Sequence, residues 1–250
     1  MSINDAFFNY LKDKLLMRCF DRIEYRDSFV NGSCIHMNST QLYRNIENCF
    51  QGDINDCAVF VDGTRFNGKV YVGNGKPEVQ LGEAEISSFT LGGYLYCFFS
   101  LPKSFFAIQN GELLYDKESV YCMDFFKCLE EYKNNSATKK CYVVIMDAYN
   151  LVNRMNETLD RIPEVSYTCG FVDYIKMDTG ERIEKIMNRD INRIVFTKDP
   201  PYKYQREFRY YVTSQNNKPY LEFAGKDMTD ICFLTFEHNP YDLDVFEMIK

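Results

Sequence analysis

The chain has 250 residues, of which 46% are hydrophobic and 26% are charged, with 13 Gly and 7 Pro. This composition is typical of a globular protein and excludes a disordered chain or a fibrous repeat. No apolar run approaches the roughly 18 residues of a transmembrane helix, so we expect no membrane partner. The formal net charge of -7 makes the molecule as a whole repel nucleic acid.

The first twenty residues do not resemble a signal peptide, because charged side chains interrupt every apolar run. We therefore expect a cytoplasmic protein, in which the ten cysteines are reduced thiols and most of them are buried. The cysteines form no C-x-x-C pair, and neither His36 nor His238 has a cysteine doublet beside it. This spacing predicts no metal site. We expect His36 to be a hydrogen-bonded core residue and His238 to be exposed in a loop.

The first half of the chain predicts one helix followed by short elements. Apolar residues recur at helical spacing over residues 7–19 and predict an amphipathic first helix. Residues 22–26 alternate between charged and less polar side chains and predict a short strand, and residues 34–37 predict another. Asn38 or Ser39 is expected to cap a helix that runs to Glu47. Further strands are predicted over residues 58–61, 69–72, 78–81 and 94–100.

The second half adds two helices and several strands. Helices are predicted over residues 120–132 and 148–162, and residues 141–146 (C-Y-V-V-I-M) form the strongest core strand. Strands are also predicted over residues 166–177, 194–197, 204–212, 219–223 and 231–236. Because strands outnumber helices without alternating strictly with them, the sequence predicts an α+β fold with a mixed, mainly antiparallel sheet core and peripheral helices. No Pro/Ser/Gly-rich linker interrupts the chain, so we expect a single domain over residues 1–250.

Residues 204–212 (Y-Q-R-E-F-R-Y-Y-V) carry the strongest chemical signal. Side chains on a strand alternate between its two faces. One face is therefore polar, and the other is mainly apolar and expected to pack on the core. The polar face presents Gln205, Glu207, Arg209 and Tyr211. It is interpreted either as a solvent-facing ladder of cross-strand pairs or as a cleft in which a carboxylate lies beside an amide and a guanidinium.

Two parts of the chain resemble a broad group of bacterial and phage proteins. The first box spans residues 32–39 (G-S-C-I-H-M-N-S) and continues with Leu42, Tyr43, Arg44, Glu47, Gly52 and Asp53. The second comprises Phe196, Lys198, Tyr202 and residues 204–209 (Y-Q-R-E-F-R). The group has no established activity, so this resemblance implies no particular reaction.

A second resemblance is to ADP-ribosyltransferases, which use an Arg on an early strand, a Ser on a middle strand and a Glu in a late Q/E-x-E motif. Residues 205–207 (Q-R-E) are similar to the last element, and residues 23–26 (I-E-Y-R) are similar to the first. Ser100 in residues 97–100 (C-F-F-S) is the counterpart of the middle element, with Ser87–Ser88 as the alternative. The resemblance implies an ADP-ribosyltransferase-like fold that binds NAD.

In such a site Glu207 would stabilise the positive charge that develops on the ribose, and Gln205 would help to place the acceptor. Arg26, or Arg44 in its place, would hold the pyrophosphate through fork-like hydrogen bonds. Ser100 would complete the NAD pocket. The implied function is that of a toxin or phage-conflict effector, which transfers ADP-ribose from NAD to a nucleic acid or protein acceptor and is restrained by an antitoxin or inhibitor protein.

Two other functions stay open at this point. The first is a non-enzymatic host–phage conflict protein that binds and blocks a partner, which NAD binding would distinguish from an ADP-ribosyltransferase. The second is a Mg²⁺-dependent nuclease that uses Asp53 and Asp56, for which metal-dependent activity would be the sign. Arg44 and Glu47, three residues apart on a predicted helix, also fit a local ion pair without a catalytic role.

Overall fold

The structure is a computed structural model, and it describes residues 3–45, 58–61, 69–71, 77–80, 87–109, 112–175, 194–215 and 218–238. Its main strands are β1 (Lys14–Phe20), β2 (Ile35–Ser39), β7 (Tyr94–Pro102), β10 (Tyr142–Asp147), β11 (Val165–Phe171), β14 (Glu207–Ser214), β15 (Tyr220–Phe223) and β16 (Cys232–Glu237). Paired short strands are β3 (Ala58–Val61) with β6 (Ser87–Thr90), β4 (Lys69–Tyr71) with β5 (Pro77–Gln80), β8 (Phe106–Gln109) with β9 (Glu112–Tyr115), and β12 (Asp173–Tyr174) with β13 (Thr197–Lys198).

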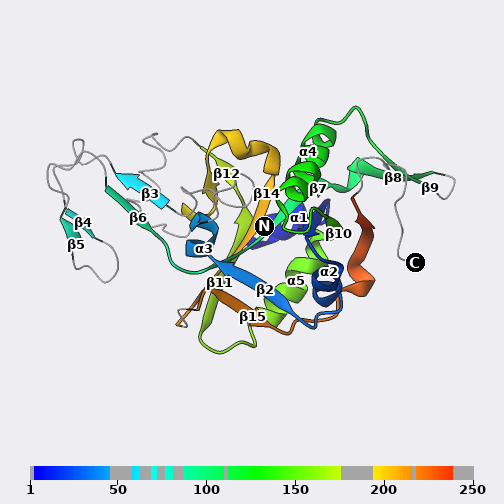
Figure 1. Ribbon diagram of the computed structural model, residues 1–250. Coiled ribbons are helices and arrows are strands. Elements are labelled where there is room, and N and C mark those ends of the chain that lie inside the picture. Colours follow the sequence, from blue (N-terminus) through cyan, green and yellow to red (C-terminus); the bar gives the residue numbers. More distant parts are fainter. Residues whose placement is uncertain are drawn as a thin grey trace.

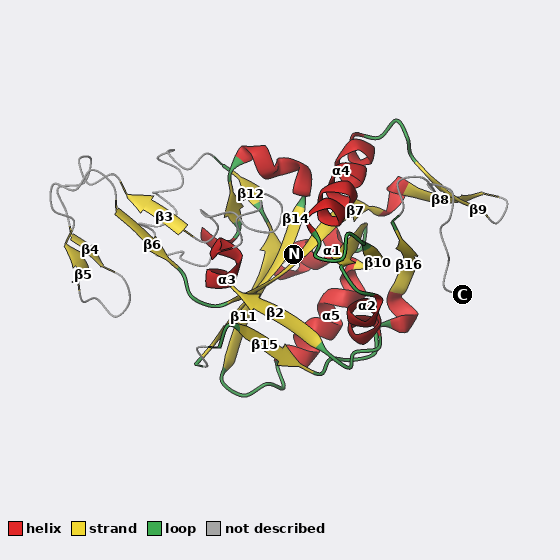
Figure 2. Ribbon diagram, in the orientation of Figure 1, coloured by secondary structure: helices red, strands yellow, loops and turns green. Residues whose placement is uncertain are grey.

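The α-helices are α1 (Ile3–Leu11), α2 (Ile23–Val30), α3 (Thr40–Asn45), α4 (Val120–Asn135) and α5 (Ala148–Leu159), and the 3₁₀ helices are η1 (Lys103–Phe105), η2 (Pro200–Gln205) and η3 (Thr229–Ile231). The main strands form one eight-stranded sheet at the centre of the molecule (Figures 1 and 2). Its strand order is β11–β14–β7–β1–β10–β16, with β2 beside β7 and β15 beside β2. Every pair in this sheet is antiparallel, which confirms an α+β fold with a mainly antiparallel sheet.

Both faces of the sheet are covered, and the alternation of side chains along each strand assigns most of them to two large cores, with a smaller cluster around Leu95 and Tyr211. One core packs against α1, α2 and α5, and its members include Phe29, Val152 and Phe208. The other packs against α4 and the start of the β8–β9 hairpin, and it includes Phe99 and Phe125. Figure 1 shows α4 on one side of the sheet and α2 and α5 on the other. Within the described residues, no helix has both the length and the apolar character needed to cross a membrane.

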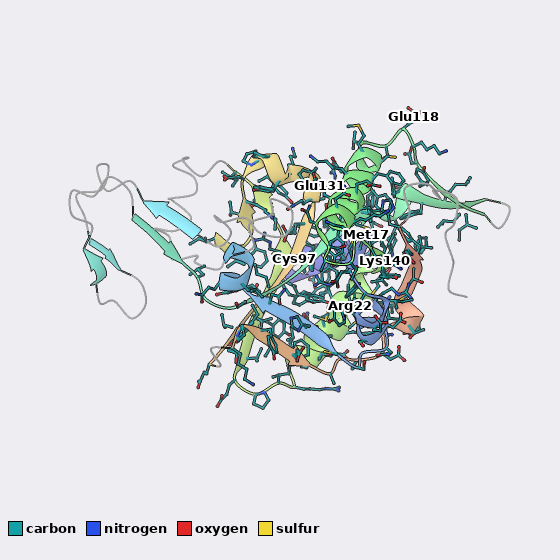
Figure 3. The ribbon with its side chains drawn as sticks, viewed as in Figure 1. Met17, Arg22, Cys97, Glu118, Glu131 and Lys140 are labelled. Carbon is teal, nitrogen blue, oxygen red and sulfur yellow. The ribbon has the colours of Figure 1, made fainter. Side chains whose placement is uncertain are left out.

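The predicted first helix is too long. Helix α1 ends at Leu11, and residues 14–20 form β1, which pairs with both β7 and β10 at the centre of the sheet. Leu15 and Met17 enter the core under α4, whereas Leu16 enters the opposite core. A strand that is buried on both faces is apolar without alternation, so its pattern resembles that of a buried helix. Figure 3 shows Met17 among the side chains crowded at the sheet, with Glu118 at the periphery.

The predicted strand over residues 22–26 is also wrong, because these residues begin α2. The helix is anchored by Phe29, whose ring lies 5.5 Å from that of Tyr96 and 5.6 Å from that of Phe20. Packing of this one aromatic side chain outweighs the weak alternation of the preceding residues. Arg26 therefore lies on a peripheral helix and not on a strand of the sheet.

Several other predicted elements are confirmed. Ser39 caps α3, since its Oγ accepts a hydrogen bond from the Leu42 N–H. Helix α4 starts after Ser119, and α5 starts after Asp147, whose carboxylate accepts from the Asn150 N–H. Strand β10 is buried along residues 142–146, as expected of the strongest core strand. The β8–β9 hairpin and β6 were not predicted from the sequence.

Two adjacent glycines before β7 give a test of the packing. Gly93 has a φ of +135°, and a Cβ there would lie 2.5 Å from Tyr211 Cε2 and 2.9 Å from the Val212 carbonyl oxygen. Gly92 has no heavy atom within 4 Å of such a Cβ. We predict that Gly93→Ala lowers the free energy of unfolding by roughly 1–3 kcal/mol, because it combines backbone strain with a clash.

Gly92→Ala is the matched control, and it should leave the urea midpoint within error of the unmodified chain. Equal midpoints for the two variants would contradict the described approach of Tyr211 to Gly93.

Candidate functional site

The predicted polar face of residues 204–212 is a buried charged cluster. Lys198 ends β13, Gln205 ends η2 and Glu207 begins β14, and all three side chains are buried. The Lys198 ammonium donates to Gln205 Oε1 at 2.7 Å and lies 3.4 Å from Glu207 Oε2. The structure therefore brings Gln205 and Glu207 together at Lys198, which was not among the predicted site residues. Its place in the second resemblance box was the one feature of the sequence that pointed to it.

Arg209 binds the Glu207 carboxylate with two hydrogen bonds. Its Nε donates to Oε1 at 2.6 Å and its Nη2 donates to Oε2 at 3.0 Å. The remaining guanidinium nitrogen, Nη1, donates to the Val195 carbonyl oxygen at 2.6 Å. Arg209 is fully buried, so this planar fork holds both carboxylate oxygens inside the protein. Both oxygens of the Glu207 carboxylate are therefore bound by Arg209, which lies two residues further along β14.

The electrostatics of this cluster favour an ionised Glu207. Burial by itself would raise the pKa of the carboxyl, but the Arg209 guanidinium and the Lys198 ammonium outweigh burial and hold the pKa of Glu207 well below its usual range. Tyr174 lies against the same strand, and its hydroxyl oxygen accepts the Glu207 N–H at 2.9 Å. A carboxylate held in this way is a strong structural partner and a poor proton carrier.

Neither interpretation of the polar face matches the structure, because the face is neither exposed to solvent nor an open cleft. The alternation itself is confirmed from Glu207 onward: Phe208, Tyr210 and Val212 lie in one core, and Tyr211 lies on the opposite face. The strand does not extend back to residue 204. Helix η2 runs to Gln205, and Arg206 takes a left-handed conformation with a φ of +41° before β14 begins.

Ser100 lies on β7 next to β14, but it points away from Glu207. Phe99 is the residue opposite Glu207, and Phe99 belongs to the core under α4. Since neighbouring residues on a strand face opposite ways, Ser100 projects into the other core, as does Leu16, the residue paired with it on β1. The two predicted site residues are neighbours in the sheet, but they lie on opposite faces.

Arg26, the first of the two predicted arginines, does not reach Glu207 either. Arg26 lies on α2, which covers the face opposite to Glu207, and its guanidinium pairs with Asp27 at 2.8 Å. Arg44 lies on α3, and its side chain is outside the described residues, as are Glu47, Asp53 and Asp56. The predicted convergence of Arg26, Ser100 and Glu207 in one cleft is therefore wrong. The residues do not converge because the sheet is buried on both sides, so Glu207 faces one core while Ser100 and Arg26 lie on the other face.

The histidines have exchanged their expected environments. His36 is exposed, and its ring nitrogens lie 2.7 Å from Glu222 Oε1 and 2.8 Å from Asn38 Oδ1. His238 is buried, with its Nε2 at 2.8 Å from Glu130 Oε1.

All eight cysteines in the described part of the chain are free thiols, but only Cys128 and Cys141 are buried, so the expectation of mostly buried thiols is too strong. Within that part no group of three metal-ligating side chains comes together.

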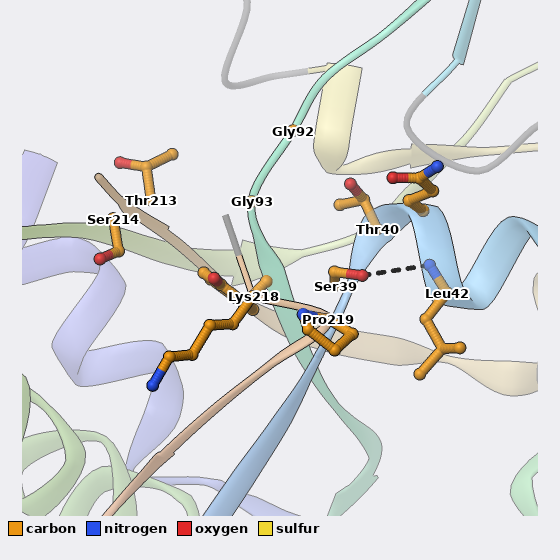
Figure 4. A pocket seen from close by; sticks show the side chains of 11 residues that line it. Ser39, Thr40, Leu42, Gly92, Gly93, Thr213, Ser214, Lys218 and Pro219 are labelled. Carbon is orange, nitrogen blue, oxygen red and sulfur yellow. Dashed lines mark hydrogen bonds between the residues drawn. The ribbon is translucent and has the colours of Figure 1, made fainter. Parts of the chain in front are cut away.

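An open pocket of about 560 Å³ lies at the other end of β14 (Figure 4). Its lining joins the start of α3, the entry to β7, the end of β14 and the segment before β15. The residues are Ser39, Thr40, Gln41, Leu42, Gly92, Gly93, Tyr94, Thr213, Ser214, Lys218 and Pro219. A volume of this size is typical of small-molecule sites. No sequence pattern predicted this pocket, although Ser39 and Leu42 belong to the first resemblance box.

Two features give the pocket its chemical character. Lys218 is the single charged side chain among the described lining residues, and none of the described acidic groups forms an ion pair with it. The Ser39 Oγ accepts from the Leu42 N–H, which leaves the Ser39 hydroxyl proton available to a ligand. Thr40 Oγ1 donates to the Leu91 carbonyl oxygen at 2.7 Å and fixes the wall. The described lining offers donors and contains no carboxylate, imidazole or thiol.

Comparison with known proteins assigns the chain to no family. No family model matches the chain, and no curated protein or solved structure matches it either.

The buried cluster makes Glu207 a strong determinant of stability. Glu207→Gln keeps the size of the side chain and removes the charge that faces Arg209 and Lys198. We predict a loss of roughly 3–5 kcal/mol in the free energy of unfolding, because the substitution leaves buried cations without their carboxylate. Urea unfolding followed by circular dichroism measures this loss.

Glu222→Gln is the control, since Glu222 pairs with His36 at the surface. The control should cost no more than about 1 kcal/mol. If Glu207→Gln were as mild as Glu222→Gln, the described burial of the Glu207–Arg209 pair would be contradicted.

The low pKa of Glu207 also predicts a pH dependence. A carboxyl whose pKa is lower in the folded chain than in the unfolded chain, where it is about 4.3, stabilises the fold above that pH. This contribution is lost as the pH falls from about 4.3 through the folded pKa. Glu207→Gln lacks the titrating group. We therefore expect the gap in unfolding free energy between the two proteins to be constant from pH 5 to 7 and to shrink at lower pH. A gap that widens on acidification would contradict this prediction.

Proposed function

We propose that this protein acts by binding a partner and blocking it, and that an anionic group of the partner sits in the pocket beside Lys218. The observation that carries the proposal is the lining itself. Hydroxyl groups and one ammonium without a described counter-ion surround open space, and the described lining holds no acid–base or nucleophilic thiol group. Such a lining suits recognition of a phosphate or carboxylate better than chemistry on it.

The state of Glu207 supports binding over catalysis. A catalytic carboxylate has to reach substrate, but both Glu207 oxygens are engaged by Arg209 within the protein. ADP-ribosyl transfer from NAD, together with an ADP-ribosyltransferase-like fold, an acceptor and an antitoxin, stays a prediction from resemblance. The described geometry gives it no support, since Arg26 and Ser100 lie on the face opposite to Glu207. A role in host–phage conflict likewise stays a prediction.

A matched pair of substitutions tests the pocket. A side chain at Gly92 projects into open space, so Gly92→Trp should fill the pocket and Gly92→Ala should leave it open. Isothermal titration calorimetry with inorganic phosphate and acetate, as the simplest phosphate and carboxylate, measures binding. We expect at least one of these anions to bind the unmodified chain and Gly92→Ala, and neither to bind Gly92→Trp. Lys218→Gln should weaken binding about 10–100-fold, the loss typical of a charged hydrogen bond.

Two outcomes would overturn the proposal. One is binding that is unchanged in both Gly92→Trp and Lys218→Gln. The other is consumption of NAD by the unmodified chain, which would restore ADP-ribosyl transfer as the leading function.

A further inference from the structure

Strand β11 is an end strand of the main sheet, and its outer edge is unpaired among the described residues. It pairs with β14 on one side through an unbroken register from Val165, opposite Ser214, to Phe171, opposite Phe208. The strand order places no described strand on its other side. An edge of this kind presents backbone donors and acceptors to whatever approaches it.

The hydrogen bonds to β14 define which backbone groups of β11 point away from β14. The N–H of Val172, just after β11, donates to the Glu207 carbonyl oxygen at 2.9 Å. In an antiparallel pair every second residue bonds to the same neighbour, so Gly170, Thr168 and Ser166 also direct their backbone groups toward β14. The backbone groups that point outward are those of Val165, Tyr167, Cys169 and Phe171.

Natural edge strands are usually protected against pairing with another chain. The common devices are a charged side chain, a proline, a bulge or a very short strand. Strand β11 (V-S-Y-T-C-G-F) has no charge and no proline, and its seven residues keep one register. By contrast, the short strand β15 carries Glu222, and β16 ends in Glu237. The outer edge of β11, which has no partner in the described part of the chain, therefore lacks the features that prevent association.

We infer that β11 pairs with β11 of a second copy of this chain, antiparallel, about a two-fold axis at Thr168. In this register Val165 lies opposite Phe171 and Tyr167 lies opposite Cys169, so the four outward residues meet one another and can exchange backbone hydrogen bonds. These are the side chains that pack against the core under α1 and α5. The apolar face of one strand therefore continues into the apolar face of the other, and the small residues Ser166, Thr168 and Gly170 share the opposite face.

The same chemistry argues for a second copy over an unrelated strand. A two-fold interface has to be complementary to itself. An uncharged strand that alternates apolar and small side chains, with its outward groups symmetric about Thr168, meets that condition. A shift of the register by one residue would place apolar side chains against the small ones, so a single pairing is favoured.

A cysteine at the axis gives a direct test. In a non-hydrogen-bonded antiparallel pair the two Cα atoms are about 4.5 Å apart, within the range that a disulfide spans. Thr168→Cys should therefore form a covalent dimer under mild oxidation, detected by non-reducing electrophoresis and intact mass. Ser166→Cys is the control. In this register its two copies are about 13 Å apart, so it should not be cross-linked above the background of the native thiols.

Sedimentation velocity over a range of concentrations completes the test without oxidation. The unmodified chain should dimerise, and Thr168→Lys should raise the dimer dissociation constant at least about tenfold, because two ammonium groups meet at the axis. A monomer at all concentrations would overturn the inference. So would a dimer that Thr168→Lys leaves intact, or equal cross-linking of the two cysteine variants.

Discussion

The structure depends on one constraint, which is that the central strands are buried on both faces. Strands β1, β7 and β14 are covered on both faces, so most of their side chains enter one of three buried clusters. A charged residue on a fully buried stretch of such a strand must find its partners inside the protein. That condition determines the environment of Glu207 and Arg209, and it explains why residues that are close along the sheet do not meet in one site.

The pairing of Glu207 with Arg209 follows from this constraint. The two residues are separated by one position on β14, so they share a face, and a bidentate guanidinium satisfies both carboxylate oxygens. Lys198 and Gln205 approach from β13 and η2 and enclose the pair. This arrangement anchors the start of β14 to the segment before it. The pocket lies at the far end of the same strand, where the lining belongs to loops and element ends and polar groups stay accessible.

The sequence was sufficient for the fold class, for β10, and for helices α4 and α5, because these elements have strong periodicity or a recognisable cap. It was insufficient for β1, whose two-sided burial removes the alternation that identifies a strand. It was also insufficient for α2, which depends on the packing of Phe29. For the site, the strand alternation predicted that Gln205 and Glu207 lie close together. It could not predict that Ser100 projects from the opposite face of the sheet. That fact depends on the register between β7 and β14, which no local pattern specifies.

We conclude that Glu207 is a structural group, ionised at neutral pH and enclosed by cations, and not a carboxylate available to a substrate. Carbon-13 NMR of the side-chain carboxyls of glutamate, followed through a pH titration, reports this directly, with Glu207→Gln used to assign the signal. The account predicts that the Glu207 carboxyl titrates well below the ordinary value of about 4.3 and that its signal does not move when NAD is added. A Glu207 pKa at or above the ordinary value, or a Glu207 signal that shifts on addition of NAD, would contradict it.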